Sequence, residues 1–220
     1  MALNVDTSSW LQANISGIDV PVSFWVTLRT HATANTYTFG MYTSLAFNAR
    51  GIGAQMNNQG TGNPNTILGS TSGSQSHFGG ANCDTGWHTH GFSLDASGNS
   101  LYSFDLNVSG TATGQGDWND YNANRVGIGN IPDWFGAYAS GGADSDHQCV
   151  AVWNAALTAA EFNQLYYTRN PAMMRPQNLV LYHPMINTNY NQGAWGGNTF
   201  ARSGSSDPTD ITHQPMKMRF

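Results

Sequence analysis

Carboxylates come first, because paired acids cleave glycosidic bonds. Glu161 is the only glutamate among 220 residues, and a retaining glycosidase needs two carboxyl groups about 5 Å apart. Among the close aspartate pairs, the candidates are Asp117 with Asp120 and Asp144 with Asp146. Both pairs lie in Gly- and Asn-rich stretches, which give catalytic groups little rigid support. We therefore expect a protein that is not an enzyme.

Metal ligands are the second candidate chemistry. Asp144 and Asp146, with neighbouring carbonyls, would supply the oxygen ligands that calcium prefers; the alternative is a solvated acidic turn, since no twelve-residue calcium loop accompanies them. His88 and His90 would share one face of a strand, as two ligands of a transition metal do. We favour packing and hydrogen bonding for these histidines, because no zinc motif is present. The expectation is no cofactor, with calcium as the candidate metal.

Aromatic residues beside amides are the best candidates for ligand binding. Trp118, Asn119 and Tyr121 form one such group, and Trp134 and Tyr138 form a second. This mixture stacks on a sugar face while it hydrogen-bonds the hydroxyls. The alternative is that these rings pack under their own loops or in a subunit interface, where Trp and Tyr are also enriched.

The composition excludes several partners. Charged residues make up 10% of the chain, the net charge is −5, and the seven arginines are scattered, so no basic cluster is available for nucleic acid or an anionic membrane. The sequence shows neither an export signal nor a run of ~20 apolar residues, which predicts synthesis in the cytoplasm. Cys83 and Cys149 either form one bridge or stay as buried thiols, and we favour thiols.

Period-two alternation predicts the strands that must position these residues. Val22, Phe24, Val26 and Leu28 alternate with Ser23, Trp25, Thr27 and Arg29, the pattern of a half-buried strand. A hairpin is expected between 92–94 and a strand of 102–108, around the turn formers of 95–99. Shorter candidate strands are 37–42, 44–49, 125–128, 148–153 and 178–183.

A single short helix is expected near residues 158–169. Thr158 and Glu161 have the spacing of a capping box, and Leu157 with Phe162 forms a hydrophobic staple across the helix start. Asn170-Pro171 ends the helix.

The end of the chain differs from the rest. Residues 187–206 are polar and Gly-rich with few alternating apolar positions, so we expect a domain of 1–186 followed by a Gly/Ser-rich arm of 187–220. The apolar side chains of 216–220 would dock on a neighbouring subunit, which predicts a homo-oligomer, or on their own domain.

Three stretches resemble the concanavalin A-like lectin/glucanase superfamily, in its laminin-G-like or pentraxin-like branch. They are Val20-Pro-Val-Ser-Phe-Trp-Val-Thr-Leu28, the block from Gly86-Trp-His-Thr-His90 to Tyr102, and Cys149-Val-Ala-Val-Trp153 with the helix start that follows it. The resemblance implies an all-β fold, a two-sheet antiparallel jelly-roll sandwich. It also implies that ligands, where a member has them, bind at rim loops or on the concave face.

The continuation Leu179-Val-Leu-Tyr-His-Pro184 resembles lectin-like structural proteins of tailed bacteriophages. This resemblance implies a non-catalytic decoration or fibre module on a phage capsid or tail, with other virion proteins as partners and the virion as its location. The alternative is a lectin module that recognises neutral glycans on the host surface.

Overall fold

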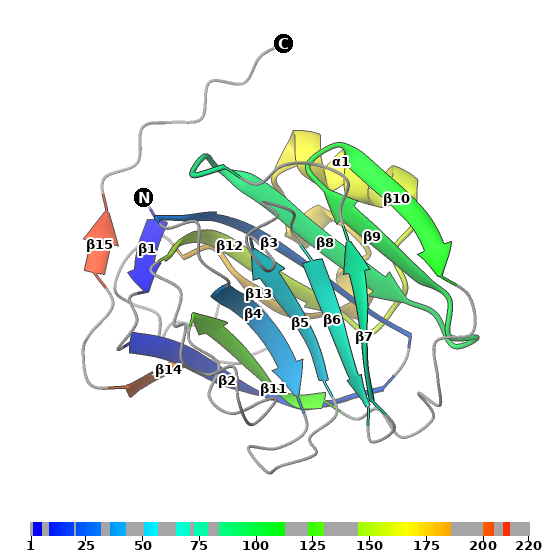
Figure 1. Cartoon of the computed structure of the whole chain (residues 1–220), viewed down its shortest axis with the longest axis horizontal. Helices are drawn as coiled ribbons and strands as arrows, with labels where there is room; N and C mark the ends of the chain where they lie inside the picture. The colour runs from blue at the N-terminus through cyan, green and yellow to red at the C-terminus, as the bar shows by residue number, and fades with distance from the viewer. Residues whose placement is uncertain are drawn as a thin grey trace.

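The described residues form an all-β sandwich with one α-helix on its outside (Figure 1). The computed structural model describes residues 2–5, 9–19, 21–31, 36–42, 51–56, 65–70, 73–78, 84–112, 123–129, 145–185, 200–204 and 209–211. The α-helix in this part of the chain is ten residues long, and no described helix is long and apolar enough to cross a membrane.

Sheet A carries most of the motifs that the sequence singled out. Its antiparallel strands follow the order β10 (Asn107–Ala112), β9 (Ser100–Phe104), β8 (His88–Leu94), β3 (Val22–Thr30), β12 (Ser145–Trp153), β1 (Ala2–Val5) and β15 (Thr209–Ile211). An eighth strand, β13 (Leu179–His183), also pairs with β12. It takes the same edge of β12 as β1, farther along the strand.

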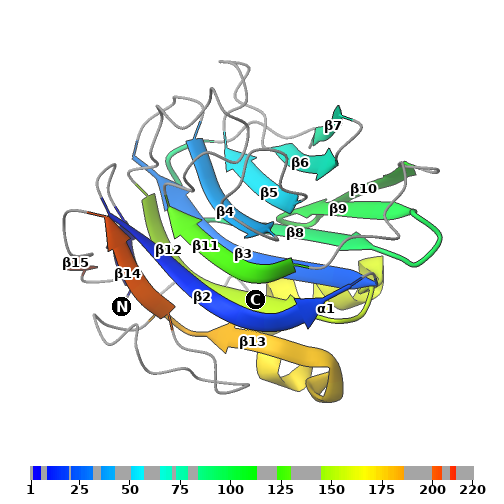
Figure 2. The same cartoon turned by 90° about the horizontal axis from the view of Figure 1, so that it is seen from below.

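Sheet B forms the second layer (Figure 2). Its order is β14 (Phe200–Gly204), β2 (Ser9–Ile18), β11 (Ala123–Gly129), β4 (Thr36–Tyr42), β5 (Gly51–Met56), β6 (Asn65–Ser70) and β7 (Gly73–Phe78). The predicted two-sheet antiparallel jelly-roll sandwich with one short helix is therefore confirmed.

The main core lies between the two sheets. The even-numbered apolar residues of β3 all belong to it, as the alternation predicted. Phe24 reaches Phe39 of β4 on the opposite sheet, with ring centroids 4.6 Å apart. Burial of each large apolar side chain contributes about 1.5–3 kcal/mol, so this layer accounts for much of the stability.

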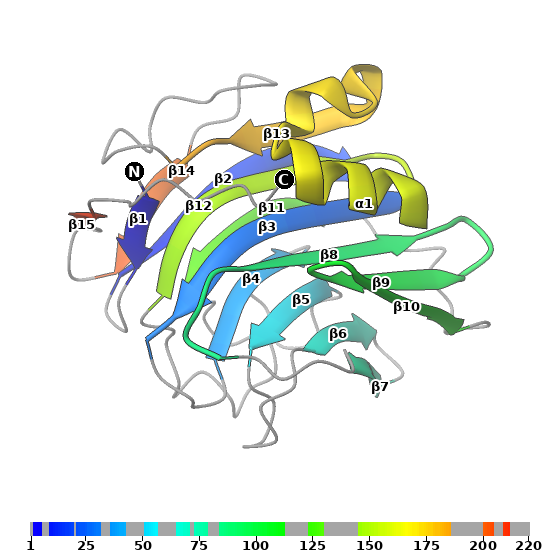
Figure 3. The ribbon, with the colours of Figure 1, turned by 90° about the horizontal axis from the view of Figure 1, so that it is seen from above.

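A second apolar cluster covers the outer face of sheet A and corrects one prediction. Trp25 is 1% exposed and Ser23 is fully buried, so β3 is buried on both faces, not on one. The helix α1 (Ala159–Thr168) lies over this face with Phe162 and Leu165 in the cluster (Figure 3). A Cβ at Gly91 would lie 2.6 Å from the Phe162 ring, which explains the glycine under the helix.

The helix begins as predicted. The Thr158 side chain accepts from the Glu161 backbone N–H, while the Glu161 carboxylate accepts from the Thr158 N–H at 2.7 Å, a complete capping box. Leu157 and Phe162 belong to the same cluster, in agreement with the staple. Glu161 also accepts from Arg175, a residue of the turn between two 3₁₀ helices, Pro171–Met173 and Pro176–Asn178.

The predicted hairpin is real, but its second strand is shorter than expected. Leu94 pairs with Ser100 around the Asp95–Asn99 turn, and the Asp95 carboxylate accepts from the backbone of Ser97 and Asn99. The expected strand 102–108 is divided by a tight turn at residues 105–106, where Asp105 has φ 51°. A left-handed residue is costly inside a strand, so the chain reverses there and β10 begins.

The remaining strand predictions fall into two groups. Those at 37–42, 125–128, 148–153 and 178–183 are confirmed as β4, β11, β12 and β13, whereas 44–49 lies outside the described residues. The structure adds β1, β2, β5, β6 and β7.

The C-terminal part corrects the expected arm. Residues 200–204 form β14 beside β2, with Phe200 fully buried in the main core. Residues 209–211 form β15 beside β1. These two segments complete the sheets of their own chain. The docking tail 216–220 lies outside the described residues.

Candidate functional site

The residues predicted to bind a ligand cannot be placed. Trp118, Asn119, Tyr121, Trp134 and Tyr138 all lie outside the described residues. The aromatic sites proposed from the sequence therefore remain predictions. Asp117 and Asp120, one of the two aspartate pairs, lie outside them as well.

Asp146 is the described member of the predicted calcium pair. Its side chain is fully buried in β12, and its Oδ2 accepts from Arg29 Nε and lies 2.9 Å from His31 Nε2. The Arg29 guanidinium lies 5.3 Å from the ring of Trp87. Asp146 thus forms ion pairs with residues of this chain, while Asp144 lies outside the described residues, so the calcium site stays a prediction.

His88 lies between two carboxylates. Its Nδ1 is 2.9 Å from Asp105 Oδ2, and its Nε2 is 3.1 Å from Asp84 Oδ1. Burial opposes protonation of the ring, but hydrogen bonds to Asp105 and Asp84 outweigh it and raise the pKa of His88. The Asp105 Oδ1 accepts from the backbone N–H of Thr89 at 2.8 Å and from its hydroxyl. These four residues are called the His88 cluster below.

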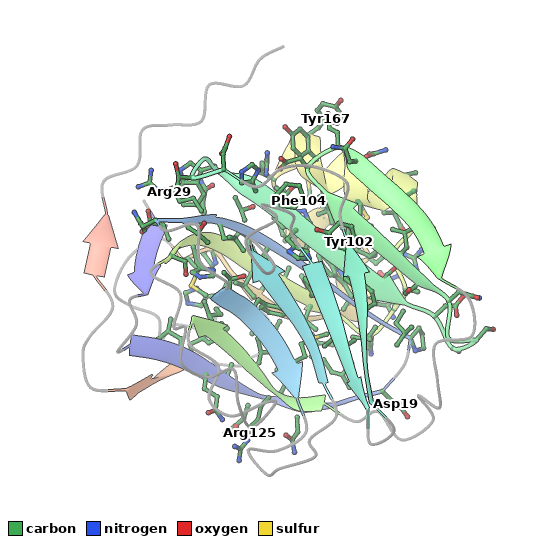
Figure 4. The ribbon with its side chains drawn as sticks, in the orientation of Figure 1. Asp19, Arg29, Tyr102, Phe104, Arg125 and Tyr167 are labelled. Carbon is green, nitrogen blue, oxygen red and sulfur yellow. The ribbon has the colours of Figure 1, made fainter. Side chains whose placement is uncertain are left out.

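His90 lies in the main core, two residues along the same strand. Its ring packs against Tyr102 and Phe104 of β9, whose side chains are labelled in Figure 4. Burial lowers the pKa of His90 to about 3, so the ring is neutral at neutral pH. His88 thus serves hydrogen bonding and His90 serves packing. The described residues contain no group of three metal-ligating side chains.

A cavity of about 220 Å³ opens on the outer face of sheet A, beyond the end of α1. Its walls come from four segments that are far apart in the sequence. The lining residues are Trp25, Thr27, Gln148, Cys149, Arg169, Tyr182 and Pro184. Its volume equals about seven water molecules at roughly 30 Å³ each, enough for one small ring.

Two irregularities of β12 create this cavity. His147 pairs with Leu28 and Cys149 with Thr27, so Gln148 is an extra residue without a counterpart on β3. Such a bulge re-aims side chains, and it brings Gln148 and Cys149 to the same wall. On the opposite edge of β12, β1 pairs up to His147 and β13 pairs from Val150, which leaves the bulge between the two strands.

Three polar atoms of the cavity residues are buried and have no hydrogen-bond partner among the described residues. They are Thr27 Oγ1, Gln148 Oε1 and Arg169 Nη1; we call them the open polar atoms. Buried polar groups of folded proteins nearly always have partners, and each that lacks one costs about 1–3 kcal/mol. All three belong to residues that line one cavity, and polar groups gathered at one cavity are the pattern of a ligand site.

The remaining walls are aromatic or inert. Trp25 and Tyr182 line the cavity, and burial raises the pKa of Tyr182 to about 12. Burial also raises the pKa of the Cys149 thiol far above its usual range, and Cys149 is a free cysteine. A thiol that stays protonated is a poor nucleophile. The cavity therefore offers binding groups rather than a reactive centre.

Few local signals in the sequence predict this site. The alternation of β3 placed Trp25 and Thr27 on one face, but it predicted that this face would be half exposed. Arg169, directly after the helix, was treated as one of several scattered arginines. Only the bulge at Gln148 and the packing of α1 bring these residues together, and neither has a local sequence signature.

The chain is similar to solved structures, although no protein-family model and no curated protein matches it. A candidate carbohydrate-binding protein from Bacteroides ovatus has a TM-score of 0.64 and 14% identity, over 96% of this chain and 61% of that one. A heptameric SAP-like pentraxin from Limulus polyphemus has a TM-score of 0.59 and 14% identity, over 72% of this chain and 76% of that one. The CBM40 of Ruminococcus gnavus IT-sialidase has a TM-score of 0.51 and 13% identity, over 73% of this chain and 98% of that one.

These similarities concern the fold, since every identity is below 15%. They agree with the two-sheet sandwich of this chain. The chain has the concanavalin A-like lectin/glucanase fold, shared with pentraxins and with carbohydrate-binding modules.

Proposed function

We propose that this protein is a non-catalytic, lectin-like module that binds one sugar ring of a glycan in the cavity between β12, β13 and the end of α1. The observation that carries the proposal is that three residues with open polar atoms line one cavity together with the half-buried ring of Tyr182. Sugar rings present hydroxyls at their edges and an apolar face, and such a wall complements both.

Two further observations support binding without catalysis. The single glutamate caps a helix and accepts from Arg175, so it is engaged outside the cavity. The cavity residues include no carboxylate, and glycoside hydrolysis normally requires a pair of them. The fold is also that of a protein described as a candidate carbohydrate-binding protein and of a sialidase CBM40.

The test is retention on a glycan microarray that presents neutral and acidic glycans. Gln148→Leu removes one open polar atom, and we expect it to weaken retention about tenfold, the equivalent of one hydrogen bond of about 1.4 kcal/mol. The matched control is Gln164→Leu, the same change at an exposed position of α1. Equal retention by both variants, or no retention of the wild type, would contradict the proposal.

We also propose that the module works on a phage particle. Support comes from the resemblance of 179–184 to phage structural proteins, now located in β13 beside β12. A homo-oligomer held by the tail is part of this proposal. The mass in solution, measured by light scattering with and without residues 212–220, tests it. A shorter truncation is required than removal of 187–220, because β14 and β15 belong to the sheets; a monomer in both samples contradicts the oligomer.

A further inference from the structure

Arg169 is fixed at the wall of the cavity. It is the C-cap of α1, with φ 52° and its N–H bonded to the Leu165 carbonyl at 2.9 Å. Its guanidinium lies 4.4 Å from the centre of the Tyr166 ring and 5.9 Å from that of Trp25. Backbone and cation–π contacts thus hold the positive charge in one place.

The charge of Arg169 has no carboxylate partner among the described ion pairs. Asp105 acts on it electrostatically, but the Asp105 oxygens are bound to His88 and Thr89. Burial lowers the pKa of Arg169, yet a guanidinium stays charged at neutral pH. A half-buried cation without a counter-charge is costly, and a bound anion would remove that cost.

The other residues that line the cavity determine which chemical groups the anion must carry besides its charge. Gln148 Oε1 is an acceptor without a donor among the described residues, and Thr27 Oγ1 is a hydroxyl in the same state. Chloride or sulfate satisfies the charge of Arg169 but has no hydrogen to donate to Gln148, and a hydrogen phosphate has no apolar face. A sugar ring with a carboxylate has the charge, the hydroxyl donors and an apolar face for the half-buried ring of Tyr182.

We infer that the cavity takes an acidic sugar, a ring with a carboxylate directed at Arg169, in place of the neutral glycan expected from the low charge of the chain. This inference rests on the proposed function and narrows its substrate class. A neutral sugar of equal size would leave the guanidinium without its counter-charge. Arginine also binds a planar carboxylate through two parallel N–H groups, which gives the site an orientation.

The experiment is isothermal titration calorimetry of the full chain with matched sugars. The probes are the methyl glycosides of glucose, galactose and mannose, each paired with its uronic acid, so that members of a pair differ only at C6. Arg169→Gln removes the charge. Arg169→Lys keeps the charge but loses the two parallel N–H groups of the guanidinium. Arg125→Gln on β11 of sheet B is the matched control, on the side of the molecule away from α1 (Figure 4).

We expect at least one uronic acid to bind the wild type about tenfold or more tightly than its neutral partner. Arg169→Gln should abolish that preference and Arg169→Lys should reduce it, whereas Arg125→Gln should leave it unchanged. Unchanged melting temperatures of the variants would confirm that they are folded.

Three results would overturn the inference. If the neutral sugars bind as well as the acids, or if the preference survives in Arg169→Gln, the site does not select a carboxylate, and the proposed sugar binding stands alone. If no probe binds but the array shows a glycan whose retention depends on Gln148, the acidic-sugar inference fails in the same way. If the array and all probes show no binding, the proposed function fails with it.

Discussion

Thr27 and Thr89 face each other in register on β3 and β8, and they differ in what their hydroxyls contact. Both are 1% exposed. The Thr89 hydroxyl donates to Asp105 at 3.3 Å within the His88 cluster, while Thr27 Oγ1 has no partner in the described part of the chain. Two neighbouring positions of one sheet thus differ in role. Thr89 belongs to a polar network whose hydrogen bonds are made within the protein, whereas Thr27 lines a cavity where a ligand would supply the missing hydrogen bond.

The His88 cluster should respond most strongly to mutation. Asp105→Ala removes the carboxylate that accepts from His88 and from Thr89, and we expect the free energy of unfolding to fall by roughly 1.5–3 kcal/mol. Urea denaturation measures this change. Asp105→Asn keeps an acceptor for Thr89 and tolerates the left-handed backbone, so it should cost less. Unchanged stability of both variants would show that the cluster does not stabilise the fold.

The buried histidines should make stability depend on pH. Burial lowers the pKa of His90 to about 3 and that of His147 to about 4. Between these values and the ordinary 6.5, the unfolded chain binds protons that the folded chain does not. Each of the two therefore destabilises the fold by roughly 1 kcal/mol per pH unit as the pH falls below 6.5.

His88 has the opposite sign. Its raised pKa stabilises the fold below pH 6.5, and this contribution is lost as the pH rises through the folded value. The destabilisation by His90 and His147 is larger than the stabilisation by His88 alone. Melting temperatures should therefore fall as the pH is lowered from 6.5 to 5. His90→Leu should flatten that slope, as circular dichroism can measure; a slope that does not change would show that His90 titrates normally.

The smallest effect should come from the paired threonines. Thr89→Val removes a partnered hydroxyl and should cost about 1 kcal/mol. Thr27→Val removes a buried hydroxyl that is already without a described partner, so the apo protein should be unchanged or more stable by up to about 1 kcal/mol. The same Thr27 variant should bind sugar more weakly. If both variants lose equal stability, Thr27 has a partner in solution and the contrast fails.

Local signals predicted the elements that depend on neighbouring residues. The capping box of Thr158 and Glu161 fixed the helix start, because each group needs only a partner three residues away. The alternation of β3 gave the correct faces. The strand β2 is not among the predicted strands, although Leu11, Ala13 and Ile15 alternate along the sequence and form its buried side.

Long-range packing decided what local signals could not. The outer face of β3 is buried because α1, more than 130 positions later, covers it. The cavity needs a bulge at Gln148, a helix end at Arg169 and a strand end at Pro184, and their proximity follows from the register of β12 with three partners. The low charge of the chain therefore favoured a neutral ligand, because composition does not show that Arg169 lies beside the rings of Tyr166 and Trp25 at the cavity.

The pairing of the first strand with the last described one affects how the chain is made. Ala2 pairs with Ile211, and at ~5–20 residues per second the ribosome needs roughly 10–40 seconds to synthesise the residues between them. Until β12 (Ser145–Trp153) has been synthesised, which takes most of that interval, β1 lacks both of its neighbours in the sheet. Unpaired strand edges recruit other chains, so truncated or stalled products of this protein should aggregate more readily than the complete chain.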